Sequence, residues 1–396
     1  MKVRSVVTPD LAAVHFDGRT VAIRLDHGRI MAIDPAPGPA TAVILPLPAE
    51  PHVHLDKTYT AHRCRATKPG LFGAIEAMAA DKANWSEDDL HRRIARGLSG
   101  AYTNGVAAMR SHIDWTEPGV PLAWAVLGEA AQDWRHRISV QRAALAPIDL
   151  LGDADHGPSI AATVAKDGGV LGAFIYRNEG LATKLDRVFA LAVRHGLALD
   201  FHVDEGLEPE AQGFDAIVAL TAKHSLGGRV LCGHACSLSI RPDTEVARVV
   251  DAAARAGVAL TVMPSTNLYL QDMAPCRTPR LRGLAPMHEL RNAGVEVLLG
   301  TDNVRDPFYP YGVYDPVDTL RLGAVSAHLD PAVWHDAITT TPARVMGFDL
   351  PKIAVGQPAN FMLIEGADWA DAISNPRAGR HIFRAGKTQT QGAVAA

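Results

Sequence analysis

Short apolar segments alternate with longer amphipathic segments over about 300 residues in the middle of the chain, and this alternation constrains the fold most strongly. Strands that alternate with helices form parallel sheets, and eight such units favour a closed (β/α)8 barrel. An open doubly wound sheet is the competing fold, but no G-x-G-x-x-G sequence or phosphate-binding loop follows any of these strands. We therefore predict an α/β protein with a (β/α)8 TIM barrel. The eight candidate strands are residues 47–56, 106–114, 139–147, 170–176, 197–204, 229–234, 258–264 and 295–302.

One helix–strand unit shows the pattern clearly. Gly196 supplies a left-handed stop at the end of the predicted helix over residues 183–196. The next segment, residues 197–204, is short, apolar and aromatic, which is typical of a strand buried on both faces. His202 and Glu205 come at its end and are too polar to bury without a function. The predicted buried face of the helix holds Leu185, Val188, Phe189, Ala192 and Val193.

Both ends of the chain carry short β segments punctuated by Asp, Gly and Pro. We predict that residues 1–47 and 350–390 together form one small β-sandwich domain, and that residues 48–349 form the catalytic barrel. Two unrelated flanking segments are the alternative.

The composition is that of a globular enzyme. The 396 residues are 47% hydrophobic and 21% charged. A net charge of −4 provides no basic surface for nucleic acid or an anionic membrane. No segment has the apolar core of a signal peptide or of a membrane span. Four cysteines are too few for a disulfide scaffold, which favours a reducing compartment, so we expect a cytoplasmic protein.

Histidines and one aspartate mark the ends of four predicted strands. His52 and His54 are two residues apart on the first strand, so both imidazoles project from the same face. His202, His234 and Asp302 end three later strands. Because barrel strands converge at their carboxyl ends, these side chains can meet at one point. Such a set of His and Asp ligands suits Zn²⁺ or Fe²⁺ better than Mg²⁺ or Ca²⁺.

The order of these motifs resembles the amidohydrolase superfamily over nearly the whole chain. Residues 54–58 (HLDKT), 201–205 (FHVDE), 233–234 (GH) and 300–312 (GTDNVRDPFYPYG) are similar to the cytosine deaminase branch, which includes N-isopropylammelide amidohydrolase. The resemblance implies a proton-shuttling Glu205 and a homo-oligomeric assembly. It also implies that His234 hydrogen-bonds the attacking water and that four residues bind the metal, namely His52, His54, His202 and Asp302.

The number of metal ions is indicated by the lack of a lysine at the end of the fourth predicted strand. Many binuclear members of the superfamily have a carboxylated lysine at the end of the fourth strand. Here that position offers Tyr176 and Arg177, and no lysine occurs before Lys184. We therefore expect one divalent metal ion, Zn²⁺ or Fe²⁺.

The chemistry of such a site is hydrolytic. A metal held by neutral imidazoles lowers the pKa of water from about 15.7 toward 7. Attack on an amidine-like carbon then requires that the water proton be stored and that the leaving nitrogen be protonated. Our hypothesis is that Asp302 accepts the water proton, that Glu205 protonates the ring nitrogen and then the departing amine, and that His234 holds the attacking hydroxide.

Three residues are candidates for substrate binding. Asn303 follows the predicted aspartate ligand, where the best-known cytosine deaminases have a second Asp, and Asn both donates and accepts. Phe308 matches an aromatic that closes over the substrate ring. Lys57 has a counterpart in N-isopropylammelide amidohydrolases and can bind an oxo group or pair with an acid. Pro147 stands where those deaminases have a glutamine, so cytosine itself is in doubt.

Other polar residues near the strand ends have structural alternatives. His112 and Asp114 can orient the metal ligands or be satisfied core groups. Cys232 and Cys236 flank His234, but no second cysteine pair exists for a structural zinc site.

Three functions follow from these observations. The leading hypothesis is a metal-dependent hydrolytic deaminase of a cytosine-like heterocycle. The second is hydrolysis of another C–N bond, in an N-alkyl aminotriazine or a cyclic amide. A non-catalytic barrel stabilised by metal is the third, and Glu205 argues against it because a structural site needs no acid.

Overall fold

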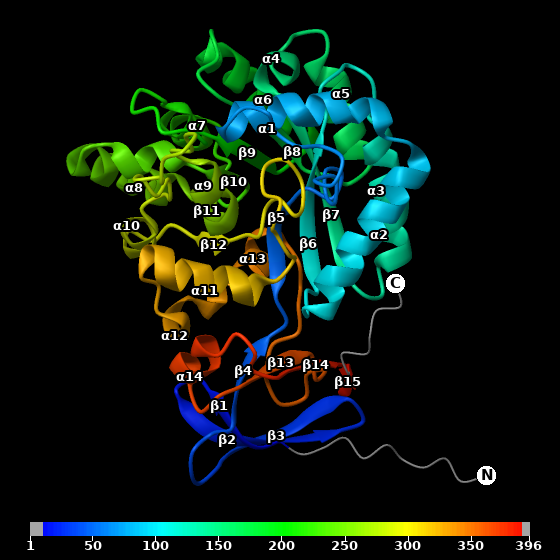
Figure 1. Ribbon diagram of the computed structural model, residues 1–396, viewed down its shortest axis with the longest axis vertical. Helices are drawn as coiled ribbons and strands as arrows, with labels where there is room; N and C mark the ends of the chain where they lie inside the picture. The colour runs from blue at the N-terminus through cyan, green and yellow to red at the C-terminus, as the bar shows by residue number, and fades with distance from the viewer. Residues whose placement is uncertain (1–10, 390–396) are drawn as a thin grey trace.

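Eight parallel strands form the central sheet of the computed structural model, which describes residues 11–389 (Figure 1). The strands are hydrogen-bonded in chain order from β5 to β12. The sheet closes where Val53 pairs with Asp302 and the Asp302 N–H donates to the His52 carbonyl at 2.9 Å. The predicted (β/α)8 barrel is therefore confirmed, and all eight candidate strands are present. They are β5 (Ala49–Val53), β6 (Ala108–Asp114), β7 (Ser139–Pro147), β8 (Leu171–Ile175), β9 (Leu199–Val203), β10 (Val230–His234), β11 (Val258–Val262) and β12 (Val297–Leu299).

Helices surround these strands (Figure 1). Three 3₁₀ helices interrupt the series, at Lys82–Asn84 (η1), Cys236–Ile240 (η2) and His335–Ile338 (η3). The α-helices are α1 (Gly70–Asp81), α2 (Glu87–Thr103), α3 (Leu122–Trp134), α4 (Ile148–Leu151), α5 (Gly157–Lys166), α6 (Leu181–His195), α7 (Gly213–Lys223), α8 (Asp243–Ala256), α9 (Pro264–Leu270), α10 (Met287–Asn292), α11 (Pro316–Ala327), α12 (Pro331–Trp334), α13 (Thr340–Val345) and α14 (Trp369–Ser374).

Helix α6 tests the predicted helical spacing. It ends at Gly196, whose φ of 65° is left-handed as expected. Four of the five residues predicted to be buried are buried, but Val193 is 52% exposed and Leu191 is buried in its place. The buried face of α6 therefore includes Leu191, on one side of Ala192, and not Val193, on the other side, where the spacing had placed it.

A second sheet joins the two ends of the chain at the lower side of Figure 1. It contains β1 (Leu11–Phe16), β2 (Arg19–Asp26), β3 (Arg29–Pro35), β4 (Ala42–Pro46), β13 (Phe361–Glu365), β14 (Arg380–Arg384) and β15 (Lys387–Gln389). Their order in the sheet is β15-β14-β13-β4-β1-β2-β3, so β4 from the amino-terminal part pairs with β13 from the carboxyl-terminal part.

Alternation along these strands gives the sheet two apolar faces, because successive side chains of a strand point to opposite sides. One face forms a core of its own with Ile44, Phe361, Leu363 and Phe383. The other face packs on the barrel core through Leu45, Met362, Ile364 and Ile382. The prediction that both termini build one small domain beside the barrel is confirmed, and the strands of the predicted β-sandwich lie in one seven-stranded sheet. Residues 1–10 and residue 390 of the predicted range lie outside the described residues. Within residues 11–389, no helix is both long and apolar enough to span a bilayer.

Candidate metal centre and active site

Three histidines and one aspartate from three separate strands meet at one point. The Nε2 atom of His202 lies 2.9 Å from Nε2 of His52 and 3.1 Å from Nε2 of His54. An Asp302 carboxylate oxygen lies 3.3 Å from Nε2 of His54 and 3.8 Å from Nε2 of His52. All four residues are buried. The residues predicted as metal ligands are therefore brought together.

These distances fit a shared metal ion. Two ligand atoms that each lie about 2.0–2.2 Å from one ion can be at most about 4.4 Å apart, and all the distances given above are shorter than this limit. Burial lowers the pKa of His52, His54 and His202 well below the ordinary value, so each ring is neutral and offers a lone pair. Three neutral imidazoles that aim their Nε2 atoms at one point cannot all satisfy each other by hydrogen bonds, because each has only one N–H. A cation at this point would accept the lone pairs of all three Nε2 atoms.

The backbone at the strand ends is shaped to aim these groups. Asp302 and His234 have φ values of 61° and 72°, which non-glycine residues rarely adopt and which are often found at functional sites. Gly233 leaves room for the neighbouring ring, since a Cβ there would lie 2.9 Å from Cε1 of His52. The local sequence therefore favours an inward position for His52 beside β10.

Glu205 and His234 form a second pair at the edge of the cluster. The Glu205 carboxylate lies 3.6 Å from Nε2 of His234, and both side chains are buried. Burial raises the pKa of Glu205 well above its usual range, and the charge of Asp302 adds to this effect. Burial lowers the pKa of His234 to about 4. A protonated acid therefore faces a neutral imidazole beside the candidate metal centre.

Asn267, which was not among the predicted site residues, orients His234. Its side-chain amide lies 3.0 Å from Nδ1 of His234, so Nε2 is the ring nitrogen that faces Glu205. Asn267 and its neighbour Thr266 are both fully buried in α9, directly after β11. The sequence shows only that two polar residues follow the apolar strand at its carboxyl end, and it does not indicate that Asn267 contacts His234.

A buried charge network lies behind the metal cluster. Arg110 donates to the Asp200 carboxylate at 2.6 Å, and Nε2 of His112 lies 3.2 Å from the other Asp200 oxygen. The His112 ring packs 4.1 Å, centroid to centroid, from the ring of His52. His112 therefore contacts a candidate ligand, and Asp200 holds it in place. Although burial opposes ionisation, His112 and Arg110 together lower the pKa of Asp200.

Replacing Arg110 by methionine should destabilise the fold by about 3–5 kcal/mol, because it leaves the buried Asp200 carboxylate without one of its two partners and without the permanent positive charge of the guanidinium. Urea unfolding of metal-loaded protein measures this change. Arg92→Met, which removes a 77% exposed arginine side chain, is the control and should change stability by less than about 0.5 kcal/mol. Equal free energies of unfolding for the two variants would show that Arg110 is not needed to keep the Asp200 carboxylate buried.

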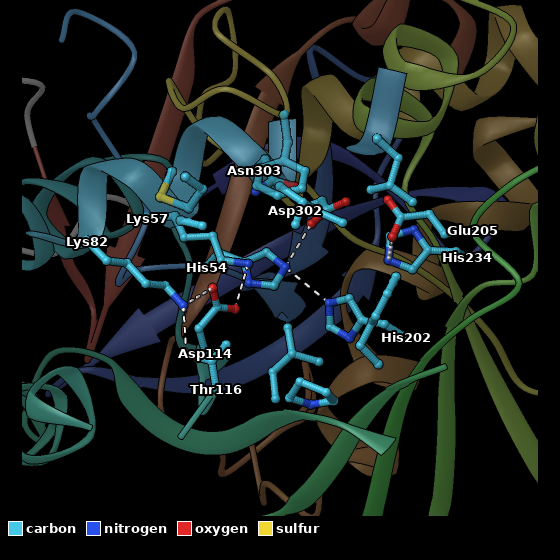
Figure 2. Close-up of a pocket in the computed structure, with 18 residues that line it drawn as sticks. His54, Lys57, Lys82, Asp114, Thr116, His202, Glu205, His234, Asp302 and Asn303 are labelled. Carbon is cyan, nitrogen blue, oxygen red and sulfur yellow. Dashed lines mark hydrogen bonds and ion pairs between the residues drawn. The ribbon is translucent and has the colours of Figure 1, made fainter. Parts of the chain in front are cut away.

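A cavity of about 180 Å³ opens onto the cluster (Figure 2). Apolar residues from α1 form one wall, and Leu145, Pro147 and Phe174 from β7 and β8 form another. All three residues predicted to bind substrate, namely Lys57, Asn303 and Phe308, line it. The apolar residues contributed by α1 are Leu71, Ile75 and Met78, followed by Ala79.

Each of the three predicted substrate-binding residues has a defined partner. Asn303 donates to Asp306 at 2.7 Å, which fixes its amide at the cavity wall. The Lys57 ammonium lies 5.0 Å from the centre of the Phe308 ring and 2.8 Å from an Asp114 oxygen. Burial alone would lower the pKa of Lys57, but Asp114 and Asp56 outweigh it, so the pKa is raised and Lys57 stays protonated. Asp114 lines the cavity and pairs with Lys57 there, a position that neither of its two predicted alternatives described.

Cys232 and Cys236 are buried and unpaired. Among residues 11–389, the groups of side chains close enough to share a metal ion contain no cysteine.

A (β/α)8 barrel with three histidines and an aspartate converging at the carboxyl ends of its strands defines the class of metal-dependent hydrolases. The sequence model of the amidohydrolase family matches residues 142–394. Pterin deaminase of Rhizobium rhizogenes is 37% identical over 350 residues, which covers 87% of this chain and 80% of that protein. The chain thus belongs to the amidohydrolase family and is a hydrolase of carbon–nitrogen bonds other than peptide bonds.

Two further proteins are similar over most of the chain. N-isopropylammelide isopropyl amidohydrolase of Pseudomonas sp. strain ADP is 22% identical over 334 residues, covering 81% of this chain and 79% of that protein. The crystal structure of 5-methylcytosine deaminase from Klebsiella pneumoniae superimposes with a TM-score of 0.85 at 23% identity, over 98% of each chain. The second likeness shows that the fold is shared along its full length.

Proposed function

We propose that this protein is a hydrolytic deaminase of a small amino-substituted nitrogen heterocycle. The observation that carries the proposal is the position of Glu205: a buried carboxyl of raised pKa lies beside His234 and next to the His/Asp cluster, at the cavity. An acid in that position can protonate a leaving nitrogen, which a metal site of purely structural use would not need. The similarity to a pterin deaminase supports this activity.

One divalent ion, Zn²⁺ or Fe²⁺, is the proposed cofactor. His52, His54, His202 and Asp302 would hold it, and both metals accept such nitrogen and oxygen ligands. A single ion is supported by the residues after β8, where Tyr176 and Arg177 take the place of a lysine. When bound, such a metal makes water acidic enough to act as a nucleophile at neutral pH.

The protein groups then manage the protons. Water adds to the ring carbon that carries the amino group, and its proton passes to the Asp302 carboxylate. Glu205 donates its proton to the adjacent ring nitrogen, then takes the remaining proton of the added oxygen and passes it to the amino nitrogen, so that the C=O bond forms, the C–N bond breaks and ammonia leaves. The proton held by Asp302 then returns to Glu205, which restores both carboxyl groups. His234, oriented by Asn267, hydrogen-bonds the attacking oxygen. The products are ammonia and the oxo form of the ring.

The substrate ring would lie between the apolar walls of the cavity. Phe308 and Phe174 supply aromatic surface, and Lys57 and Asn303 supply polar contacts to the ring edge. A two-ring pteridine is the first candidate, since the relative of 37% identity is a pterin deaminase. A cytosine-like pyrimidine is the second. Removal of an N-alkyl amine from a triazine is the alternative reaction, favoured by the similarity to the N-isopropylammelide enzyme.

Product analysis on a substrate panel tests this proposal. Metal-loaded protein is incubated with 2-amino-4-oxopteridine, cytosine, isocytosine and an N-alkyl aminotriazine. We expect ammonia in a one-to-one ratio with the oxo product of at least one aminopteridine or aminopyrimidine. Release of an alkylamine alone would establish the alternative reaction, and the absence of any product would favour a barrel that uses metal only for stability.

We also propose the assembly and location of the enzyme. Residues 1–47 with 350–390 would form one domain and residues 48–349 the other, which agrees with the separate apolar core of the small sheet. The cysteines Cys64, Cys232, Cys236 and Cys276 are all free, which favours the reducing cytoplasm. Family resemblance favours a homo-oligomer, and light scattering coupled to gel filtration measures its size.

A further inference from the structure

A group of four polar side chains occupies the part of the cavity away from Glu205 and His234. Figure 2 shows Lys57, Lys82, Asp114 and Thr116 gathered on one side of His54, whereas Glu205 and His234 lie on the other. Lys82 and Thr116 were not among the predicted site residues. Apart from Asn303 and the residues of the catalytic cluster, the remaining lining residues of this cavity are apolar.

The two lysines share one carboxylate. The Lys57 ammonium lies 2.8 Å from one Asp114 oxygen, and the Lys82 ammonium lies 3.0 Å from the other. Lys82 also lies 3.4 Å from the Thr116 hydroxyl. Burial opposes the ionisation of Asp114, but the charges of Lys57 and Lys82 outweigh it and lower its pKa. Asp114 is therefore an anion with a cation on each side.

The backbone holds this group rigidly. Asp114 ends β6, and Thr116 follows two residues later on the same side, while Trp115 between them points into the barrel core. Lys82 begins η1, directly after Asp81. Asp81 accepts hydrogen bonds from Arg63 at 2.9 Å and from the Trp85 indole at 3.0 Å, which anchor the chain beside Lys82.

Spare hydrogen-bonding capacity remains in this group. Each lysine has three N–H donors, and each ionised carboxylate has about four acceptor positions. Asp114 uses two of its positions on the lysines, and Lys57 uses one of its donors on Asp114. A carboxylate acceptor thus stands between two ammonium donors at the cavity wall. Leu145, which is the strand partner of Asp114 on β7, and Pro147 have apolar side chains.

We propose that Asp114 and Lys82, together with Lys57, bind a lactam edge of the substrate, in which a ring N–H lies next to a ring C=O. Asp114 accepts the ring N–H, and the lysine ammonium groups donate to the carbonyl oxygen. The inference rests on the proposed function and narrows its substrate class to amino heterocycles that also carry an oxo group. A ring-borne carboxylate fits less well, because it brings no N–H for Asp114.

The test compares substrates that differ only in this edge. The pairs are 2-amino-4-oxopteridine with 2-aminopteridine, and isocytosine with 2-aminopyrimidine. In the variant Lys82→Met, kcat/KM for the oxo compound should fall by about 10- to 100-fold, mainly through KM, because a hydrogen bond to a charged group is lost. For the compound without the oxo group, kcat/KM should change by less than about threefold. Lys82→Arg should keep most of the preference for the oxo compound.

An ion pair between Lys68, which precedes α1, and Glu76 of α1 provides the control. Lys68 and Glu76 lie 2.7 Å apart, are 67% and 61% exposed, and do not line this cavity. Lys68→Met should therefore leave kcat/KM unchanged for both members of each substrate pair, although it also removes one positive charge. Melting temperatures of all variants identify any loss of folding.

Two outcomes separate the failure of this inference from failure of the proposed function. If Lys82→Met lowers kcat/KM equally for both members of a pair, Lys82 only supports the structure and the inference is wrong. If the wild-type enzyme deaminates no compound, the proposed function is wrong. The Kd of each compound, measured by calorimetry, then tests the inference. The inference is correct if the wild-type protein binds the oxo compound more tightly than its partner and the Lys82→Met variant does not. It is wrong for any other result.

Discussion

Replacing Glu205 by glutamine should reduce kcat by about 10³- to 10⁴-fold while leaving metal binding intact. Glutamine has nearly the same shape, but it cannot give a proton to the leaving nitrogen. The metal should stay bound because the Glu205 carboxylate lies beside His234, outside the set of His52, His54, His202 and Asp302. Steady-state kinetics on the best substrate and metal analysis of the same sample measure the two quantities.

The control for this substitution is Glu210→Gln in the same loop. The Glu210 side chain is 58% exposed and pairs with Arg177, so its loss should change kcat by less than twofold. A Glu205→Gln enzyme with normal kcat would remove Glu205 from the mechanism. A variant that had lost its metal would instead assign Glu205 to the metal site.

Replacing His202 by alanine should abolish both metal binding and activity. The Nε2 atom of His202 lies within 3.1 Å of the Nε2 atoms of both His52 and His54, so His202 is the candidate ligand that contacts both other histidines. A metal that binds only the folded protein stabilises it by about 4 kcal/mol at a free concentration 1,000 times the Kd. We therefore expect less than 0.1 metal ion per chain and a clear fall in melting temperature.

Chelation of the wild-type protein should reproduce this result reversibly. Restoring activity with Zn²⁺ or with Fe²⁺ separately identifies the working metal. His381→Ala is the matched control, since this half-exposed histidine lies in the small sheet far along the chain from the ligands. Full metal content in His202→Ala would contradict the proposed ligand set.

The barrel and its candidate ligands could be predicted because both depend on short-range patterns. A buried parallel strand is recognisable from a few apolar residues, and the eight candidate segments all contain a strand. The tips of barrel strands converge whatever the details of packing. His52, His54, His202 and Asp302 could therefore be assigned to one place although 250 residues separate the first from the last.

Residues whose role depends on a polar contact with a residue far away in the sequence could not be predicted in the same way. Asn267 contacts a histidine 33 residues away, and Arg110 pairs with an aspartate 90 residues away. Neither has a motif, because a single buried amide or guanidinium is common in cores and gains meaning only from its partner. The exposed Val193 shows the same limit within one helix, where spacing alone placed the edge of the buried face incorrectly.

The fold class and the convergence of three histidines and an aspartate follow from the amino-acid sequence, because strand periodicity and barrel geometry are visible in local patterns. The assignment of Glu205 as the acid came from the resemblance of residues 201–205 to the cytosine deaminase branch. The identity of the other groups that share the cavity with this centre depends on the tertiary structure. Lys82 reaches Asp114 because α1 and η1 pack across the end of β6, and Asp81 is fixed there by Arg63 and Trp85. Such contacts depend on how whole elements are oriented relative to one another, and no local pattern of residues specifies that orientation.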